Sequence, residues 1–175
     1  QLVDPRELPA ELVDSINRYR FQGTSSKVNF ALDGTPHFPA LGDRFDQYRG
    51  FTNLGPSMEY LERAFDDAKY GWFSQRPYLD CAVQSVVDPD MAPPGKHVMS
   101  CFVQYTPYHL KRADGTPGDW DEERQNLGDT VQRTLESFFP GFSDLVLHRE
   151  VVTPLDIERV AGLTEGNIFH GEFLA

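Results

Sequence analysis

A strict alternation of apolar and polar side chains near the start of the sequence most constrains how this chain folds. In the segment 27–33, KVNFALD, the side chains of Val28, Phe30 and Leu32 fall on one side, and polar or small side chains fall on the other. A period of two residues is that of a β-strand, because successive side chains of a strand point to opposite faces. The segment is therefore predicted to be a strand with one buried face.

Two further strands are predicted at 78–87 and 97–105. The residues between them, 88–95, read DPDMAPPG, and Pro, Asp and Gly favour turns. The two strands are therefore expected to pair as an antiparallel hairpin. The second of them carries apolar residues on both faces, which is typical of a central strand.

The segment 34–55 is long for a loop of a compact domain and is rich in Gly, Pro and Asp. A loop of this length is expected either to be functional or to hide a short strand. Residues 51–54 are the candidate for that strand. A further strand is predicted at 145–152, shortly before the end of the chain.

Four helices are predicted where a capping residue is followed by apolar residues at spacings of three and four. They begin after Asp4, Ser57, Asp119 and Thr153, and the helix after Asp119 has acidic residues in its first turn, where the helix dipole favours them. The apolar stripes of the first three helices are Leu8, Leu12, Ile16 and Tyr19; Met58, Leu61, Phe65 and Ala68; and Leu127, Val131, Leu135 and Phe138.

No series of alternating parallel strands and helices is visible in this pattern. The predicted fold class is α+β, with a mostly antiparallel sheet and helices packed on one face. A length of 175 residues suits one domain, so residues 1–175 are expected to form a single domain.

The composition excludes several classes of protein. The chain has 16 Lys and Arg against 27 Asp and Glu, which gives a net charge of −11. Nucleic acids and anionic membranes would repel such a chain, so neither is an expected partner. No window approaches 18 apolar residues, so no transmembrane segment is expected. Two cysteines without CxxC spacing indicate reduced thiols, as in the cytoplasm, or in the mitochondrial matrix of a eukaryote.

The two ends of the sequence suggest a piece of a longer protein. The chain begins at Gln1 instead of Met, its first segment looks like the approach to a helix already under way, and it stops at Ala175 without a polar tail. No charged-then-apolar leader opens it, so no signal peptide is expected. We therefore expect it to be a fragment.

The familiar nucleotide, metal and hydrolase motifs do not occur in this sequence. GxGxxG, GxxxxGK[ST], HExxH and GxSxG are all missing, so neither a dinucleotide fingerprint nor a serine nucleophile elbow is indicated. The histidines are far apart and have no ligand partners at helical spacing, so no metal site is expected. They are His37, His97, His109, His148 and His170.

Two pairs of polar residues admit a functional and a structural interpretation. Cys81 and Cys101 fall on the two hairpin strands and are either a redox pair or, as favoured by how often cysteine is buried, two small core residues. Thr153 and Asp156 could belong to a polar site, but the TPLD pattern fits a capping box better.

Two short segments are candidates for a ligand site. Tyr105, Tyr108 and His109 cluster where a central strand is expected to end, which is a common place for a pocket wall and also an ordinary strand exit. In the segment 166–171, GNIFHG, glycines would allow a flat ligand to approach the backbone, while an amide and an imidazole could bind it. The alternative is a surface loop whose glycines serve turns.

Five runs of residues resemble the phytoene dehydrogenase-like family of FAD-dependent oxidoreductases, and within it the branch of pyridine nucleotide-disulfide oxidoreductase domain-containing protein 2. The acidic and proline-rich second run and the last run are specific, whereas the helices are not. The runs are 27–34 (KVNFALDG), 85–97 (SVVDPDMAPPGKH), 102–107 (FVQYTP), 152–156 (VTPLD) and 166–171 (GNIFHG).

The resemblance implies that this chain is the later, larger part of a substrate-binding domain, without either flavin-binding motif. The full-length protein would use FAD to oxidise or desaturate an apolar or amine-like substrate, whereas the isolated chain is expected to bind no FAD and to be inactive. The expected partners are that substrate and the flavin domain of the same polypeptide. Two copies of the isolated chain are also expected to be able to associate through the face that the flavin domain would cover. No catalytic, cofactor-binding or metal-binding residue is assigned. The residues expected to face substrate or flavin are Asn167, Phe169, His170, Gly171, Tyr105, Tyr108 and His109.

A different class of function remains open from the sequence. The chain could be a stand-alone α+β module that binds a small ligand or dimerises, with no catalytic activity. A longer reading frame with a GxGxxG motif upstream would favour the flavoenzyme, and a start codon just before Gln1 with a stop after Ala175 would favour the module.

Overall fold

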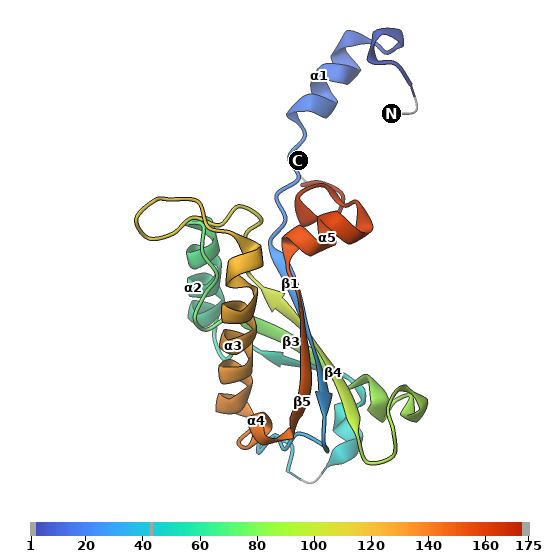
Figure 1. Cartoon of the computed structure of the whole chain (residues 1–175), viewed down its shortest axis with the longest axis vertical. Helices are drawn as coiled ribbons and strands as arrows, with labels where there is room; N and C mark the ends of the chain where they lie inside the picture. Colours follow the sequence, from blue (N-terminus) through green and yellow to red (C-terminus); the bar gives the residue numbers. More distant parts are fainter. Residues whose placement is uncertain (1–2, 43, 173–175) are drawn as a thin grey trace.

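The computed structural model describes residues 3–42 and 44–172, so the chain ends that suggested a fragment, Gln1 and Phe173–Ala175, lie outside the described residues. Five strands form one sheet in the order β2-β3-β4-β1-β5, and every pairing in it is antiparallel (Figure 1). The strand β4 is central, as predicted. The strands are β1 (Ser25–Leu32), β2 (Phe51–Leu54), β3 (Tyr78–Ala82), β4 (His97–Gln104) and β5 (Val146–Val152).

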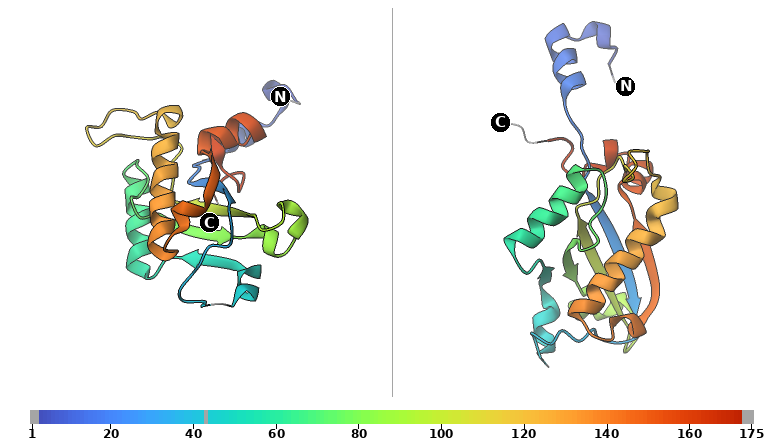
Figure 2. Two further views of the ribbon diagram at one scale, coloured as in Figure 1. Left: turned by 60° about the horizontal axis from the view of Figure 1, so that its bottom comes forward. Right: turned by 90° about the vertical axis from the view of Figure 1, so that its left-hand side faces the viewer.

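The helices α2 and α3 lie on the same side of this sheet (Figure 2, right). The fold is therefore α+β with an antiparallel sheet, which confirms the predicted class. The helices are α1 (Ala10–Arg18), α2 (Met58–Lys69), α3 (Trp120–Phe138), α4 (Phe142–Leu145) and α5 (Pro154–Ala161), and short 3-10 turns occupy Pro5–Glu7, Phe45–Arg49, Gln84–Val86, Pro89–Met91 and Thr164–Gly166.

The core lies between the sheet and α3. Val28 of β1 is fully buried and faces Cys101 of β4 on one side and Val151 of β5 on the other. The α3 residues Leu127 and Val131 are also fully buried and belong to the same cluster. The alternation in the sequence around Val28 therefore predicted the buried face correctly, because the register places every second side chain toward the helix.

The opposite side of the sheet carries neither α2 nor α3, and we call it the open face. Its side chains are half-buried or exposed and mix apolar with polar groups. By register, the residues of the open face are Phe51 and Asn53 of β2; Tyr78, Asp80 and Ala82 of β3; Val98, Ser100, Phe102 and Gln104 of β4; Lys27, Asn29 and Ala31 of β1; and His148, Glu150 and Val152 of β5.

The helices α3 and α5 begin at the predicted caps. The Asp119 side chain accepts a hydrogen bond from the backbone N–H of Asp121, and Gly141 follows α3 in the left-handed conformation that glycine permits. Thr153 and Asp156 form a reciprocal capping box at the start of α5. The structural interpretation of TPLD is therefore confirmed.

Two boundaries and the buried side of one helix differ from the prediction. Asp4 caps only a 3-10 turn, and α1 starts at Ala10, after Pro9, because the missing N–H of a proline interrupts a helix that is already under way. The predicted stripe of α2 was only partly right, because the buried residues of α2 are Ala64 and Ala68, while Met58 and Phe65 are exposed. The strand β3 ends at Ala82, and the chain turns in a 3-10 helix where the prediction had a longer strand.

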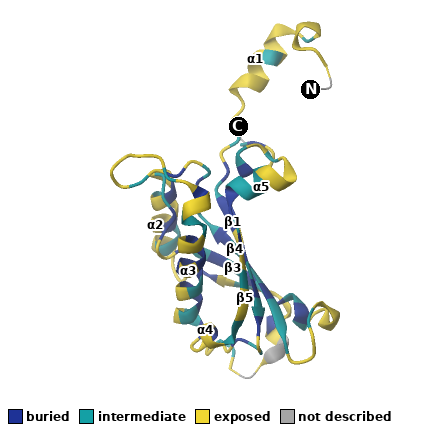
Figure 3. Ribbon diagram, viewed as in Figure 1, coloured by how far each residue is buried: buried dark blue, intermediate teal, exposed yellow. Residues whose placement is uncertain are grey.

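The helix α1 stands away from the sheet on the N-terminal arm of the chain, and none of its residues is buried (Figure 3). The predicted apolar stripe is present on it, but Leu12, Ile16 and Tyr19 are about half exposed, at 45%, 55% and 48%. Tyr19 packs against Phe21 and lies close to Gly171, but the stripe as a whole stays about half exposed.

No helix in the part of the chain that the structure describes is long and apolar enough to cross a membrane.

Candidate functional site

The end of the sheet where β4 leaves and β1 enters brings several predicted site residues together. The backbone N–H of Tyr108 donates to the carbonyl of Gly23 at 3.0 Å, so the segment after β4 runs beside the segment before β1. The indole N–H of Trp120 donates to the carbonyls of Pro107 and Tyr108, both at 3.1 Å. The strand exit is thereby fixed to the first residue of α3.

Tyr108 and His109 face two glutamates that the sequence did not single out. The Tyr108 hydroxyl donates a hydrogen bond to the Glu158 carboxylate on α5. His109 is exposed, with its Nε2 at 3.6 Å from the Glu165 carboxylate. The backbone N–H of Glu165 in turn donates to Glu158 at 2.8 Å. Glu158 thus joins the β4 exit to the segment that leads to Asn167.

The hydrogen bond from Tyr108 changes the acidity of both partners. It holds the pKa of Glu158 below its usual value, with further help from the Glu165 N–H, and it raises the pKa of Tyr108 to about 12. At neutral pH Glu158 is therefore ionised and Tyr108 keeps its proton. The pair is suited to hold structure and to accept a donor from a ligand, and it offers no group that titrates near pH 7.

Asn167 is buried, and its side-chain amide forms hydrogen bonds with backbone groups. Its Nδ2 donates to the Gln22 carbonyl at 3.3 Å, and its Oδ1 accepts from the Phe169 N–H at 2.8 Å. The Phe169 side chain is 62% exposed, and His170 is exposed with a backbone φ of 59°. Asn167 thus positions this segment, while Phe169 and His170 present their side chains to its surroundings.

Gly171 and Gly23 are sites of close backbone approach. A Cβ at Gly171 would lie 1.9 Å from the Tyr19 ring, and a Cβ at Gly23 would lie 1.9 Å from the Glu165 carbonyl oxygen. Both positions therefore require glycine for packing within the chain. The sequence analysis assigned the glycines of 166–171 to a ligand or to turns, whereas Gly171 makes room for the Tyr19 ring of the same chain.

Tyr105 lies apart from the other predicted residues. Its ring packs edge-on against Phe65 of α2, with the ring centres 5.2 Å apart. It therefore belongs to the contact between α2 and the β4 exit, and the structure does not place it with Tyr108 and His109.

A groove of about 720 Å³ runs beside Tyr108 and His109. Its walls come from the end of α2, the β4 exit and the loop before α3. The lining residues include Tyr70, Gly71, Leu110, Lys111, Trp120 and Leu155. It is the groove that two of the predicted site residues line.

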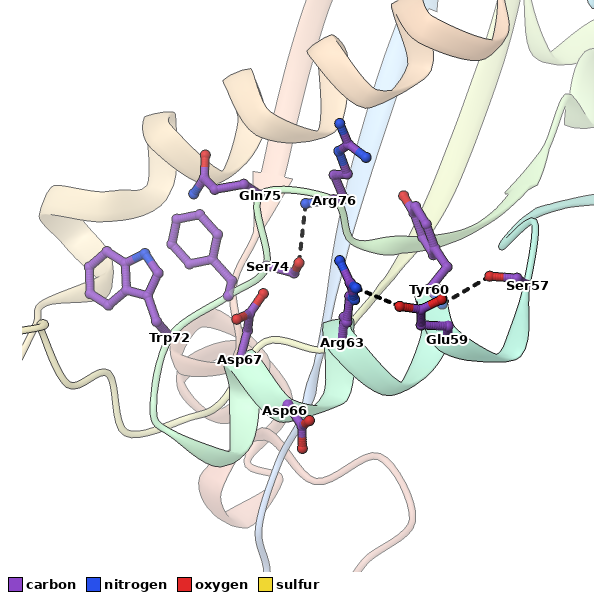
Figure 4. A pocket seen from close by; sticks show the side chains of 11 residues that line it. Ser57, Glu59, Tyr60, Arg63, Asp66, Asp67, Trp72, Ser74, Gln75 and Arg76 are labelled. Atoms are coloured by element: carbon purple, nitrogen blue, oxygen red, sulfur yellow. Dashed lines mark hydrogen bonds and ion pairs between the residues drawn. The ribbon is translucent and has the colours of Figure 1, made fainter.

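A second groove, of about 650 Å³, lies between α2 and the segment before β3 (Figure 4). Tyr60, Trp72 and Phe73 supply aromatic surface, while acids and arginines line it together. Arg63 is already paired with Glu59 at 2.5 Å, within one helix. The mixed charge gives this groove no preference for one class of ligand, and none of the predicted site residues lines it.

The open face holds a chain of hydrogen bonds across three strands. Ser100 of β4 donates to Asn29 Oδ1 of β1 at 2.8 Å, and Asn29 Nδ2 donates to Glu150 of β5 at 2.9 Å. Beside it on β3, Asp80 has a buried oxygen, Oδ1, without any hydrogen-bond partner. The sequence did not single out Asp80, which lies between the buried Leu79 and Cys81 on the opposite face of the strand.

Cys81 and Cys101 face each other across β3 and β4, with their sulfurs 3.3 Å apart. Both are free thiols, exposed to 1% and 0% respectively. The hydrogen bond between them and their burial raise the pKa of Cys81. The favoured interpretation, two small core residues, agrees with this burial. Among residues 3–42 and 44–172, no group of three or more His, Cys, Asp or Glu could hold a metal ion.

Comparison with known proteins identifies homologues of this chain. No protein-family profile matches the sequence. Pyridine nucleotide-disulfide oxidoreductase domain-containing protein 2 of Rattus norvegicus is 41% identical over 176 residues, which cover 95% of this chain. The Mus musculus protein of the same name is 40% identical over 175 residues, again 95% of this chain. This chain is homologous to a segment of these proteins.

The segment is a minor part of the two homologues, because the chain spans 29% of the length of each. Their name describes a protein that contains an oxidoreductase domain. The resemblance to the branch with this name is confirmed. The wider assignment to the phytoene dehydrogenase-like family stays a prediction.

Proposed function

We propose that this chain is the substrate-binding part of a flavin-dependent oxidoreductase, and that its open face is a wall of the site. The observation that carries the proposal is the open face itself: half-buried side chains such as Phe102 and Val98 lie on a sheet whose other face is fully packed. Antiparallel sheets tolerate one solvated face. This segment is homologous to 29% of the length of an oxidoreductase-domain protein. Apolar side chains on the open face therefore favour a contact with the rest of such a protein.

The described residues do not fit FAD by themselves. A dinucleotide is held where a parallel strand, a glycine-rich turn and a helix N-terminus meet. All strand pairings in this sheet are antiparallel, so neighbouring strands end at opposite edges of the sheet and form no such meeting point. We therefore assign the flavin to the part of the polypeptide outside this segment, where it would accept a hydride from the substrate.

The residues of this chain would bind and orient the substrate. Phe169 and His170 have exposed side chains, and Tyr108 and His109 line the groove beside the β4 exit. Asn167 and Gly171 would not touch the substrate but would hold the backbone that carries Phe169 and His170. Tyr105 lies toward α2. A substrate that is apolar or amine-like would match the mixture of aromatic and polar groups.

The stripe on α1 supports a contact with the rest of the polypeptide. A helix of nine residues is too short to be stable alone in water. Leu12, Ile16 and Tyr19 would be covered by that contact. In the isolated chain the same stripe is the surface through which two copies would associate, and sedimentation of the chain with Ile16→Glu against wild type measures this.

The test compares the complete protein with the isolated 175-residue chain. We expect the complete protein to retain FAD and the isolated chain to leave FAD free in a fluorescence titration. Tight stoichiometric binding of FAD by the isolated chain would contradict the proposal. In the complete protein, His170→Ala should weaken substrate binding or shift the flavin spectrum, and the absence of both effects would remove His170 from the site.

A further inference from the structure

Asp80 is the one residue in the described ranges with a buried side-chain oxygen that has no hydrogen-bond partner. It lies on β3, in register with Asn53 of β2 on one side and Phe102 of β4 on the other. Neither neighbour donates to it. The other polar groups of the open face, by contrast, bond one another in the chain from Ser100 to Glu150.

A carboxylate in this position works against folding. Buried polar groups in proteins are nearly always paired, because an unpaired one loses its water without compensation. Burial accordingly raises the pKa of Asp80, with no opposing contribution from a nearby cation. A group that is held at a cost to stability, on a face that a binding partner would cover, points to a role in binding.

The charged or titratable groups on the other strands of the open face are Lys27 of β1 and His148 and Glu150 of β5. Lys27 of β1 lies on the far side of Phe102 in the same cross-strand row, and it makes no ion pair with Asp80. Glu150 lies on β5, at the edge of the sheet, with β4 and β1 between it and the β3 strand of Asp80. The groups nearest to Asp80 in register on this face are therefore Asn53 of β2 and the aromatic side chains of Tyr78 and Phe102.

We infer that Asp80 binds a cationic nitrogen group of a small ligand that lies against the open face. An ionised carboxylate only accepts hydrogen bonds, and an ammonium group only donates them. The flanking rings of Tyr78 and Phe102 offer surface both to the cation and to an apolar body beside it. The inference rests on the proposed function and narrows its substrate to an amine. Rotation about the Cβ–Cγ bond exchanges the two oxygens of Asp80 and brings either of them to the ligand.

The test uses benzylamine as the cationic probe and benzyl alcohol as its neutral counterpart. In the isolated chain, we expect benzylamine to shift the amide NMR signals of residues 78–82 and 100–104 in a saturable way. Benzyl alcohol should bind at least tenfold more weakly. Asp80→Asn should weaken benzylamine binding at least tenfold, and the control Asp144→Asn, at an exposed residue, should leave it unchanged.

The variant is expected to fold, because Asp80→Asn removes the charge from a carboxylate with one buried, unpaired oxygen and should raise the melting temperature of the chain. Lys27→Met should change neither property, and a loss of stability in it would show that Lys27 pairs with Asp80 and overturn the inference. Benzylamine binding that is absent from both the isolated chain and the complete protein, or that survives Asp80→Asn, would also overturn it. FAD content plays no part in these readouts, so they are independent of the FAD titration.

Discussion

Tyr108 donates its hydroxyl hydrogen to the carboxylate of Glu158, fifty residues further along the chain, and so ties α5 to the exit of β4. Glu158 also accepts from the backbone of Glu165. One carboxylate therefore holds the two segments that carry most of the predicted site residues.

Tyr108→Phe should destabilise the chain by about 1 kcal/mol, the usual net value of one partly exposed hydrogen bond. Urea unfolding followed by circular dichroism measures this loss. The matched control is Tyr70→Phe, since the Tyr70 side chain is 80% exposed. Equal stability of the two variants would show that the contact with Glu158 contributes nothing.

Gly23→Ala should destabilise the same end of the sheet by about 1–3 kcal/mol, as overpacking commonly does. The reason is that the new methyl group would overlap the carbonyl oxygen of Glu165. Gly50→Ala is the control, because a Cβ at Gly50 meets nothing within 4 Å. A Gly23→Ala chain that melts at the wild-type temperature would mean that this close approach does not exist in solution.

His97 should make the fold less stable as the pH falls. Its Nδ1 lies 2.9 Å from the Ser85 hydroxyl and its Nε2 lies 3.1 Å from the Thr35 hydroxyl, and burial lowers its pKa below 6.5. As the pH falls below 6.5, the unfolded chain therefore takes up a proton more readily than the folded chain, so stability is full above pH 6.5 and is progressively lost below it. Thermal melts of wild type and His97→Gln across this range test the effect, which the variant should lack. Parallel pH profiles would refute the assignment to His97.

The thiols of Cys81 and Cys101 should not react with a water-soluble thiol reagent while the chain is folded. Their burial and the raised pKa of Cys81 both suppress the reactive thiolate. Both thiols should react once the chain is unfolded in guanidinium. Reaction of either thiol at the rate of a free cysteine in the native chain would place it outside the core.

The sequence predicted the sheet well because the sheet rests on a local pattern. The alternation around Phe30, the turn-rich segment before Lys96 and the cap at Asp119 each act within a few residues, so each could be found without knowing the fold. Position 128 shows what could not be found. Gly128 lies inside α3, where a Cβ would come within 2.7 Å of the Arg149 side chain of β5, and only the packing of the two elements reveals that need.

The candidate site was predicted less completely for the same reason. Tyr108 and His109 stood out as a cluster of aromatic and polar residues, but their partners Glu158 and Glu165 are distant in sequence. Asp80 looked like an ordinary polar residue of a strand, because its missing partner is a property of the folded sheet. The apolar stripe of α1 was visible in the sequence, whereas its exposure was not.

The central claim is that the open face of the sheet meets the flavin-bearing remainder of a longer oxidoreductase. The most direct measurement is the rate at which a thiol reagent modifies Ser100→Cys on that face, in the isolated chain and in the complete protein. The buried native thiols are not expected to react with the reagent. We predict modification at least tenfold slower in the complete protein, with less than a twofold change at the exposed control Asp144→Cys. Equal rates at position 100 in the two proteins would contradict the claim.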